Sequence, residues 1–281
     1  MQEGEIRITR RRKSNAIIMS LLKISTSLII LILIGSCNQL TDSPYLPPDF
    51  PIVVKADDTN VPDSLRKLYR EDAARLALRK VNEKGETDSV ELPHALVQTL
   101  YNVFIHVYNL TNLTARDSVV TIYGIHAFLY PETHSLLVAV DSTKDWVQAW
   151  RRGERFTGNE AIDKMLRDYE LLLGEYYTWP QSHHLAVLWA NKPLNIAALA
   201  KRFRGIDGVI YAEPNGTCCD GNDIKANAKS FFWELNYSVG YGDCPNGCIA
   251  RRVWTFNVFQ NGMVQYGGSS GAPPPVPGQG G

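Results

Sequence analysis

The fold of this 281-residue chain is decided by residues 184–213, HLAVLWANKPLNIAALAKRFRGIDGVIYAE. An apolar strand at His184–Ala190 is followed by a helix at Asn191–Arg204, with Pro193 in its first turn. A turn then leads into a second strand within Gly205–Glu213. A strand, a helix and a strand of these lengths predict an α+β fold, in which helices pack on one face of a sheet.

The residues before this stretch predict further helices and strands of the same fold. Apolar side chains recur every third or fourth position in the helical segments and dominate or alternate in the strands. In chain order these segments are a helix at Pro62–Val81, a helix at Pro93–Tyr108, strands at Val119–Tyr130 and Ser135–Asp141, a short helical stretch with Trp146 and Trp150, and a helix at Glu160–Leu173. His94 and His106, beside the second helix, are expected to be structural or exposed. The segments together predict helices packed on a mostly antiparallel sheet.

Two alternating segments near the end of the chain, Ser230–Val239 and Ile249–Gln260, predict strands. Asn261-Gly262 follows them, and Asn-Gly between alternating runs signals a β-hairpin, because a type I′ turn needs two residues with positive φ. We therefore expect a C-terminal, disulfide-bearing β-hairpin region. The expected organisation is a leader at 1–36, a proline-rich tether at 37–58, an α+β domain at 59–214, a cysteine-containing β region of the same globule at 215–268, and a disordered Gly/Pro tail at 269–281.

The leader holds a short apolar run, ISTSLIILILIGSC at residues 24–37, behind a basic segment. This run is too short to span a bilayer, which takes about 20 apolar residues, and it matches a secretory signal instead. Residues 34–37, Ile-Gly-Ser-Cys, resemble the lipobox of bacterial lipoproteins, although Gly or Ala is commoner than Ser before the cysteine. In that family the cysteine receives diacylglycerol, the leader is cleaved, and the new amino terminus is acylated. The resemblance implies that Cys37 is lipidated, with acyl chains such as palmitate, and anchors the chain to a membrane.

The residue after the cysteine bears on which membrane the protein is anchored in. Asn38 stands where some bacteria use Asp to retain a lipoprotein in the inner membrane, so the resemblance implies the outer membrane. Each buried CH₂ adds roughly 0.8 kcal/mol of membrane affinity, so several acyl chains hold firmly. An ordinary cleaved signal and an uncleaved single span, with Cys37 incidental, stay open as alternatives. Met19 is an alternative start, because residues 19–37 form a complete signal by themselves.

The charge balance excludes a basic nucleic-acid binder. The whole chain has 29 basic and 29 acidic residues, and six basic and two acidic residues precede Cys37. The part after the leader therefore carries 23 basic and 27 acidic residues, which makes its surface mildly acidic. A nucleic-acid partner needs a basic patch, so none is expected.

Four cysteines follow the lipobox: Cys218, Cys219, Cys244 and Cys248. An exported chain meets an oxidising compartment, where disulfides are the default. The tight turn between Cys244 and Cys248 favours a bond between them, while a vicinal Cys218–Cys219 bond and cross-pairing of the two clusters stay open. The spacing differs from the paired C-x₂-C of zinc sites and from redox C-x-x-C motifs, so no metal or cofactor is expected.

Other polar residues carry no recognisable catalytic motif. Asp220, Asn222 and Asp223 offer oxygen ligands, but they lack the order of an EF-hand and are expected to form a solvated turn. His183 and His184 precede or begin a strand, so their side chains are expected on opposite faces. Nucleophile-elbow, P-loop, H-E-x-x-H and Rossmann glycine patterns do not occur in the sequence. Catalytic residues therefore stay unknown, although an unmarked carboxylate pair needs no local motif.

Two longer stretches resemble known families. Tyr237–Phe256, YSVGYGDCPNGCIARRVWTF, resembles a set of uncharacterised exported proteins and lipoproteins of Bacteroidetes-type bacteria, and the likeness extends back to Val119–His126. It implies the compartment and no mechanism, and Cys218-Cys219 departs from the pattern. Asn195–Asn215 resembles the second helix and last strand of the ferredoxin-like prodomains of subtilisin-type proteases. That second likeness implies architecture only.

The sequence thus predicts a lipid-anchored cell-envelope protein that is more readily a non-catalytic binding or structural module than an enzyme. Its partners would be the membrane, through acylated Cys37, and an unidentified envelope ligand or protein. The candidate binding residues in the C-terminal β region are Tyr241, Asp243, Asn246 and Arg251. The alternative is an extracytoplasmic hydrolase that acts on envelope or extracellular polymers through unmarked carboxylates. A protease-inhibitor-like module is a third hypothesis, motivated by the prodomain-like segment.

Overall fold

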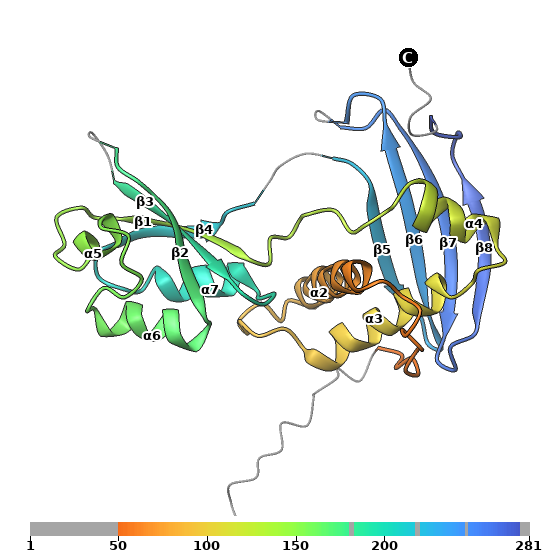
Figure 1. Cartoon of the computed structure of the whole chain (residues 1–281), viewed down its shortest axis with the longest axis horizontal. Coiled ribbons are helices and arrows are strands. Elements are labelled where there is room, and N and C mark those ends of the chain that lie inside the picture. The colour runs from red at the N-terminus through yellow and green to blue at the C-terminus, as the bar shows by residue number, and fades with distance from the viewer. Residues whose placement is uncertain (1–49, 180–182, 217–219, 245–246, 276–281) are drawn as a thin grey trace, which may run out of the picture. The chain divides into compact units, whose positions relative to one another are not determined.

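The computed structural model describes residues 50–179, 183–216, 220–244 and 247–275 (Figure 1). The leader, Cys37, Asn38, the first part of the tether and the pair Cys218-Cys219 lie outside these ranges. Residues 46–281 form one unit by their contacts. Within the described ranges, no helix has both the length and the apolar character needed to cross a bilayer. The fold combines helices with two antiparallel four-stranded sheets, and the expected α+β class is confirmed.

The first sheet has the strand order β2-β3-β1-β4, and all its strand pairs are antiparallel. Its strands are β1 (Ser135–Val140), β2 (Leu171–Tyr177), β3 (His184–Ala190) and β4 (Val209–Pro214). Helices α5 (Val147–Arg151) and α6 (Glu160–Asp168) connect β1 to β2, and α7 (Ile196–Phe203) connects β3 to β4. This β-α-β-β-α-β order is the split βαβ, or ferredoxin-like, arrangement. The prodomain-like segment thus supplies its second helix and last strand.

The first sheet, α6 and α7 share one hydrophobic core. Val138, Leu188, Leu199 and Trp150 are fully buried in it. Trp150 meets Trp146 edge to face at 5.4 Å, so the two tryptophans of the short helical stretch pack together as their spacing indicates. One face of the sheet is therefore closed by helices.

The second sheet has the sequential order β5-β6-β7-β8. Its strands are β5 (Asp223–Ala228), β6 (Phe232–Tyr241), β7 (Ala250–Phe259) and β8 (Val264–Ser270). The N-terminal helices α2 (Asp63–Lys84) and α3 (His94–Tyr108) share a second hydrophobic core with this sheet (Figure 1). Leu76, Phe104, Trp233 and Phe256 are buried in that core. The expected hairpin at Asn261-Gly262 is confirmed by the antiparallel pairing of β7 and β8. The type I′ turn is not, because Gly262 has a positive φ of 82° and Asn261 does not have a positive φ.

The packed chain begins earlier than the expected tether boundary at residue 58. The ring of Phe50 stacks on Trp233 at 5.5 Å, and the indole N–H of Trp233 donates to the carbonyl of Pro51 at 2.8 Å. Val53 and Ala56 are buried in the second core. Residues 50–58 therefore belong to the globule, because the buried indole N–H finds its acceptor there.

The strand expected at 119–130 is wrong. The chain forms a short helix α4 (Thr114–Asp117) and a π-helical turn η1 (Ser118–Ile122), and then runs without regular structure to residue 134. The amides of Tyr123 and Ile125 donate to the carbonyls of Ser118 and Val119, and Val119 is fully buried. The β-branched residues at 119–122 therefore have backbone hydrogen bonds and a contact with the core although they pair with no strand. This is possible because β propensity mainly reflects how a side chain packs.

The helix expected at 160–173 is half right. Helix α6 ends at Asp168, and Glu170 adopts a left-handed conformation with φ 54° that a helix cannot continue through. Leu171–Leu173 then pair with Ala190–Leu188 as part of β2. A short leucine-rich run fits either period, so its pattern could not separate helix from strand.

Three further boundaries differ from expectation. The side chain of Asn195 caps α7 by accepting from the amide of Ala198 at 3.1 Å, so the helix begins at Ile196 and Pro193 lies before it. Asp223 begins strand β5 instead of closing a solvated turn. Residues 267–270, of which 269–270 were expected in the disordered tail, belong to β8. Their backbone groups pair with β7 as far as Ser270 and Val253, and such pairing does not depend on large side chains.

Candidate functional site

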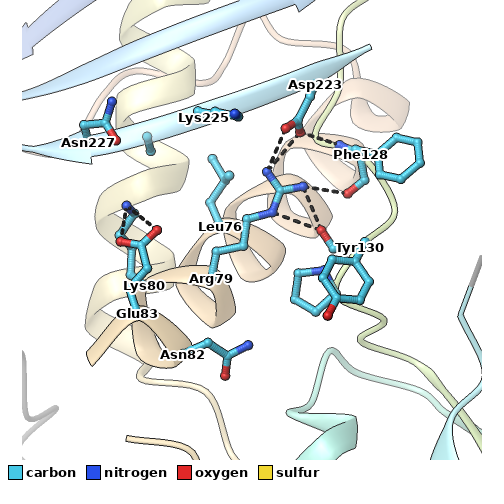
Figure 2. A pocket seen from close by; sticks show the side chains of 12 residues that line it. Leu76, Arg79, Lys80, Asn82, Glu83, Phe128, Tyr130, Asp223, Lys225 and Asn227 are labelled. Atoms are coloured by element: carbon cyan, nitrogen blue, oxygen red, sulfur yellow. Dashed lines mark hydrogen bonds and ion pairs between the residues drawn. The ribbon is translucent and has the colours of Figure 1, made fainter. Parts of the chain in front are cut away.

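Two adjoining cavities meet at the segment that leads into β1. One has a volume of about 640 Å³ and the other about 570 Å³. Both are lined by Asn82 of α2 and by Phe128, Tyr130 and Pro131 of the connecting segment. Figure 2 shows the lining of the larger of the two. We call the pair the Tyr130 hollow. Each volume lies in the range of small-molecule sites.

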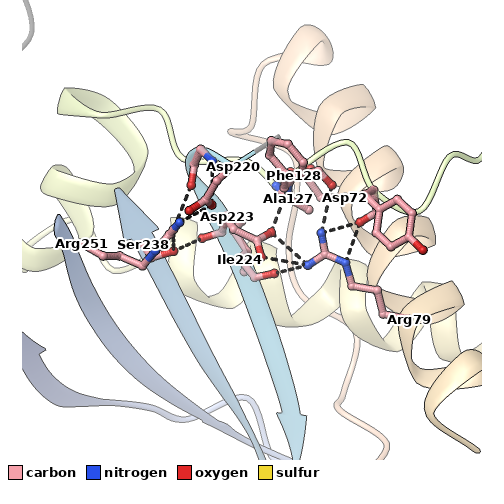
Figure 3. Close-up of polar contacts among 11 residues, drawn as sticks. Asp72, Arg79, Ala127, Phe128, Asp220, Asp223, Ile224, Ser238 and Arg251 are labelled. Carbon is pink, nitrogen blue, oxygen red and sulfur yellow. Dashed lines mark hydrogen bonds and ion pairs between the residues drawn. The ribbon is translucent and has the colours of Figure 1, made fainter. Parts of the chain in front are cut away.

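Arg79 of α2 positions the connecting segment beside the hollow. Its Nη2 donates to the carbonyls of Phe128 (2.9 Å) and Tyr130 (2.8 Å), and its Nε donates to Tyr130 again (3.0 Å). Its Nη1 donates to the carboxylate of Asp223 and to the carbonyl of Ile224 on β5 (Figure 3). All five guanidinium N–H groups are therefore engaged, and Arg79 acts as a structural link between α2, the segment and β5.

Asp223 is also fully committed. Besides the ion pair with Arg79 at 2.9 Å, its carboxylate accepts from the amide of Phe128 at 2.8 Å. Its side chain is 15% exposed. A carboxylate that already holds a guanidinium and a backbone amide fixes the wall of the hollow and has little capacity left for a ligand.

The groups that remain for a ligand come from α2, β5 and the connecting segment. Lys225 of β5 and Asn82 of α2 make no side-chain hydrogen bond within the described residues. Lys80 pairs with Glu83 across one turn of α2 at 2.6 Å, and the exposed ring of Tyr130 forms part of the opening (Figure 2). The arrangement fits a ligand that has one apolar face and a few polar groups.

The second cavity is lined by polar groups that serve the fold. One oxygen of Glu132 accepts from the amides of Thr133, His134 and Ser135 at 2.7–3.1 Å. The amide group of Asn195 donates to two carbonyls of the loop before α3, and its oxygen caps α7. These bonds set the shape of the cavity and leave little chemistry for a substrate.

Two histidine–carboxylate pairs join α2 to the connecting segment. Nδ1 of His126 lies 2.6 Å from the buried carboxylate of Asp72, which also accepts from the amide of Ala127. Nε2 of His134 lies 2.6 Å from Glu71. Nε2 of His126 makes no hydrogen bond within the described residues, so only His126 has a nitrogen open to a ligand.

The surroundings of His134 favour its charged form. Its Nε2 faces Glu71 and its Nδ1 faces the carbonyl of Ala190 at 2.9 Å, so both nitrogens donate. The hydrogen bond to Glu71 raises the pKa of His134 despite burial, and the Ala190 bond adds to it. Burial acts to raise the pKa of Glu71, but the hydrogen bond and charge of His134, with Arg75 and Lys67, outweigh it and lower that pKa.

The predicted binding residues lie around the β6–β7 loop and do not line the hollow, although Arg251 donates to Ser238, whose hydroxyl donates to the carbonyl of Asp223 in the wall of the hollow (Figure 3). Arg251 donates to the carboxylate of Asp220, to the carbonyl of Gly221 and to Ser238 (Figure 3). The hydroxyl of Tyr241 donates to the carbonyl of Ala272 at 3.1 Å. Arg251 and Tyr241 thus have partners within the chain. Asp243 has an interaction within the chain, and Asn246 lies outside the described residues. Their role in binding stays a prediction.

The Cys244–Cys248 disulfide is present in the β6–β7 loop, as expected. The amide of Cys248 donates to Asp220, and Arg251 holds the other carboxylate oxygen. The hydrogen bond from Arg251, with that from Cys248, keeps the pKa of Asp220 below its ordinary value. The loop is thereby tied to the chain segment that enters β5.

The calcium alternative finds no support in the oxygens of residues 220–223. Asp220 is bound by Arg251, Asp223 by Arg79, and the side-chain oxygen of Asn222 accepts from the amide of Gly240 at 3.2 Å. Within the described ranges, no group of three or more His, Cys, Asp or Glu side chains could hold a metal ion.

His183 and His184 point to opposite faces of the first sheet, as expected. Nδ1 of His184 contacts the hydroxyl of Tyr176 at 2.7 Å, whereas His183 packs edge to face on Tyr211. The two helix histidines behave as predicted as well. His106 contacts the carbonyl of Val54 through Nε2, and His94 is exposed.

The residues that line the Tyr130 hollow were not predicted from the sequence. Arg79 reads as the polar end of a helix, and Asp223 as part of a loop. The only local signal was the dipeptide Tyr130-Pro131, which lies between two apolar segments and is typical of an exposed turn. Comparisons with protein-family models, with curated proteins and with solved structures found no match for this chain.

Proposed function

We propose that this chain is a lipid-anchored cell-envelope protein that binds a ligand in the Tyr130 hollow without transforming it. The observation that carries the binding site is the pairing of two ligand-sized cavities around the exposed ring of Tyr130. Such rings provide a rigid apolar surface at low entropic cost. The ligand class that suits the lining is a small saccharide or peptide with an apolar face and amide or hydroxyl groups.

The charged groups of the hollow favour binding over hydrolysis. Asp223, Glu132 and Glu83 each hold a donor within the chain. A general acid or base must have its carboxyl group free to face the substrate. The engagement of these three groups with the fold therefore supports a module that holds its ligand unchanged.

The anchor is tested by intact-mass measurement of the protein from the membrane fraction, with and without reductant. We expect a mature chain that begins at Cys37 and carries the added mass of acyl chains. Reduction should add two hydrogens for the Cys244–Cys248 bond and two more if Cys218 and Cys219 are bonded. A mature end elsewhere, or a cysteine without acyl groups, would remove the anchor from the proposal.

The ligand site is tested with soluble fragments of peptidoglycan and with short oligosaccharides and peptides, using ligand-detected NMR. Tyr130→Ala should abolish the signal of any fragment that binds the wild type. Tyr177→Ala is the matched control, because Tyr177 is also an exposed tyrosine but does not line the hollow. Equal binding by both variants would move the site elsewhere.

A second candidate function, an extracytoplasmic hydrolase, is favoured by one observation. His126 is oriented by the buried carboxylate of Asp72, and its Nε2 is open. This is the arrangement of a histidine that acts as a general base. Mass spectrometry of each bound fragment after incubation separates the two functions, because hydrolysis breaks a bond and gives two smaller products whose masses sum to the fragment plus one water, whereas binding leaves the mass of the fragment unchanged. If hydrolysis occurs, His126→Gln should abolish it while the fragment still binds.

A further inference from the structure

Four large apolar side chains are exposed at one end of the second sheet. Ile52 is 61% exposed, Val54 50%, Phe231 71% and Met263 56%. They come from the N-terminal segment, the β5–β6 turn and the β7–β8 turn, and we call this group the apolar end. In Figure 1 the N-terminal segment, coloured orange, lies at the end of the sheet where these two turns lie.

Backbone hydrogen bonds hold the three segments of the apolar end side by side. The amide of Val54 donates to the carbonyl of Gln260 at 2.9 Å. The amide of Gln260 donates to the carbonyl of Phe231 at 3.2 Å, and that of Phe259 donates to Met263 at 2.9 Å. Segments separated by about 180 residues are therefore fixed side by side. The four side chains project from one rigid edge.

Charges of both signs lie near the apolar end. Lys55 and Lys229 are exposed there, with Asp57 beside the first and Glu234 beside the second. The exposed Lys84 lies close by, with its Nζ 4.2 Å from the centre of the Phe50 ring, so these side chains do not form a patch of one sign. An attraction at this surface would therefore come from apolar burial and would change little with salt.

The route of the chain links the apolar end to the anchor. The described residues begin at Phe50, which stacks on Trp233 next to Pro51 and Ile52. Only the twelve residues 38–49 separate it from Cys37. Even fully extended they reach about 40 Å. A lipid on Cys37 would therefore hold the point where the tether joins the globule, at this end of the sheet, within that distance of the bilayer.

We propose that the apolar end is a membrane-docking surface that inserts Phe231 and Met263 into the interfacial layer of the bilayer. The proposal rests on the lipid anchor of the proposed function. A second copy of the chain fits less well. The four side chains expose roughly half of the ~800 Å² that each partner of a stable complex buries. A lipid surface needs no such area, because the anchor already supplies the main binding energy.

Docking would also orient the molecule. Strands β6 and β7 are ten residues long, which corresponds to about 33 Å. The Cys244–Cys248 loop lies at the far end of these strands from the β5–β6 and β7–β8 turns. The disulfide loop would therefore face away from the membrane.

The test replaces the natural anchor, so that it does not depend on acylation of Cys37. A chain that begins at Asn38 retains every described residue and both cores. It would carry a histidine tag before Asn38 and be held on phosphatidylcholine vesicles that contain a nickel-chelating lipid. Amide hydrogen exchange would be compared with that of the same chain in solution.

We expect several-fold slower exchange at residues 230–231 and 261–263 on the vesicles, and no change at residues 247–249. The slowing should persist in 0.5 M NaCl. Phe231→Ser and Met263→Ser should each remove it. Ile249→Ser is the matched control, because Ile249 is 82% exposed at the opposite end of the same sheet, and it should keep the slowing.

Equal exchange on vesicles and in solution would overturn the proposal, and so would slowing at both ends of the sheet. Slowing that grows with protein concentration in solution would assign the surface to a second copy instead. If Cys37 is not acylated, this appears only in the intact mass of the natural protein and not in the vesicle experiment. The two failures are therefore distinguishable.

Discussion

The guanidinium of Arg79 and the carboxylate of Asp223 lie 2.9 Å apart, although 144 residues separate them in sequence. Their side chains are 19% and 15% exposed. Through this pair α2 is fixed to β5, and the carbonyls of Phe128 and Tyr130 are fixed to α2. The shape of the Tyr130 hollow therefore depends on one side chain.

Arg79→Ala should lower the free energy of unfolding by about 2–4 kcal/mol, because it removes the charged partner of a mostly buried carboxylate and the guanidinium donors of three carbonyls. Urea unfolding followed by circular dichroism measures the change. Arg152→Ala is the control, since Arg152 and Glu154 form an exposed pair whose attraction is screened by solvent. Similar losses in the two variants would contradict the structural role of Arg79.

The His134–Glu71 pair should make stability depend on pH. The raised pKa of His134 gives a contribution that is complete below about pH 6.5 and is lost as pH rises through that raised pKa. The lowered pKa of Glu71 gives a contribution that is present above about pH 4.3 and is lost as pH falls. The pair should therefore stabilise most between about pH 4.5 and 6.5.

The measurement is the difference in unfolding free energy between the wild type and Glu71→Gln at several pH values. We expect the difference to be largest near pH 5.5 and to shrink towards alkaline pH, since neutral His134 no longer needs the carboxylate. Glu154→Gln serves as the control, because its partner Arg152 keeps its charge throughout this range. A difference that does not vary with pH would show that His134 is not charged in the fold.

Gly240→Ala should impair the Cys244–Cys248 disulfide. A Cβ at this position would overlap the sulfur of Cys248 and approach the carbonyl of Gly221 at 3.1 Å. We expect a loss of about 1–3 kcal/mol, typical of overpacking, and a larger fraction of free thiol. Thiol labelling under denaturing, non-reducing conditions measures that fraction. Gly205→Ala is the control, since its Cβ would meet only the carbonyl of Arg202 at 3.7 Å.

Trp233→Phe should loosen the N-terminal segment. The substitution keeps the ring that stacks on Phe50 but removes the indole N–H that donates to Pro51. We expect a loss of about 1 kcal/mol and faster amide exchange at residues 52–56. Amide exchange in α3 should stay at the wild-type rate when the two proteins are compared under conditions of equal global stability. Unchanged protection of residues 52–56 would show that apolar packing alone holds the segment.

The local elements were mostly predictable, because they depend on near neighbours in the sequence. The periodic runs of α2, α3, β3 and β7 gave the right type of element, and Asn261-Gly262 gave the position of the β7–β8 hairpin. Strand β5 was missed because DIKANA holds few apolar residues. The run at 119–122 was misread because its β-branched residues pack in a helical turn.

The sequence by itself determined the α+β class, the leader-like apolar run, and a cysteine spacing short enough for the Cys244–Cys248 bond. Each of these is a property of residues within a few positions of one another. Only the tertiary structure decided that α2 packs on the last four strands, and that Arg79 meets Asp223. The tertiary structure also decided the Tyr130 hollow and the apolar end, because each of them joins segments that are 100 or more residues apart. Such contacts are selected by burial and hydrogen-bond satisfaction over the whole chain, which no local pattern records.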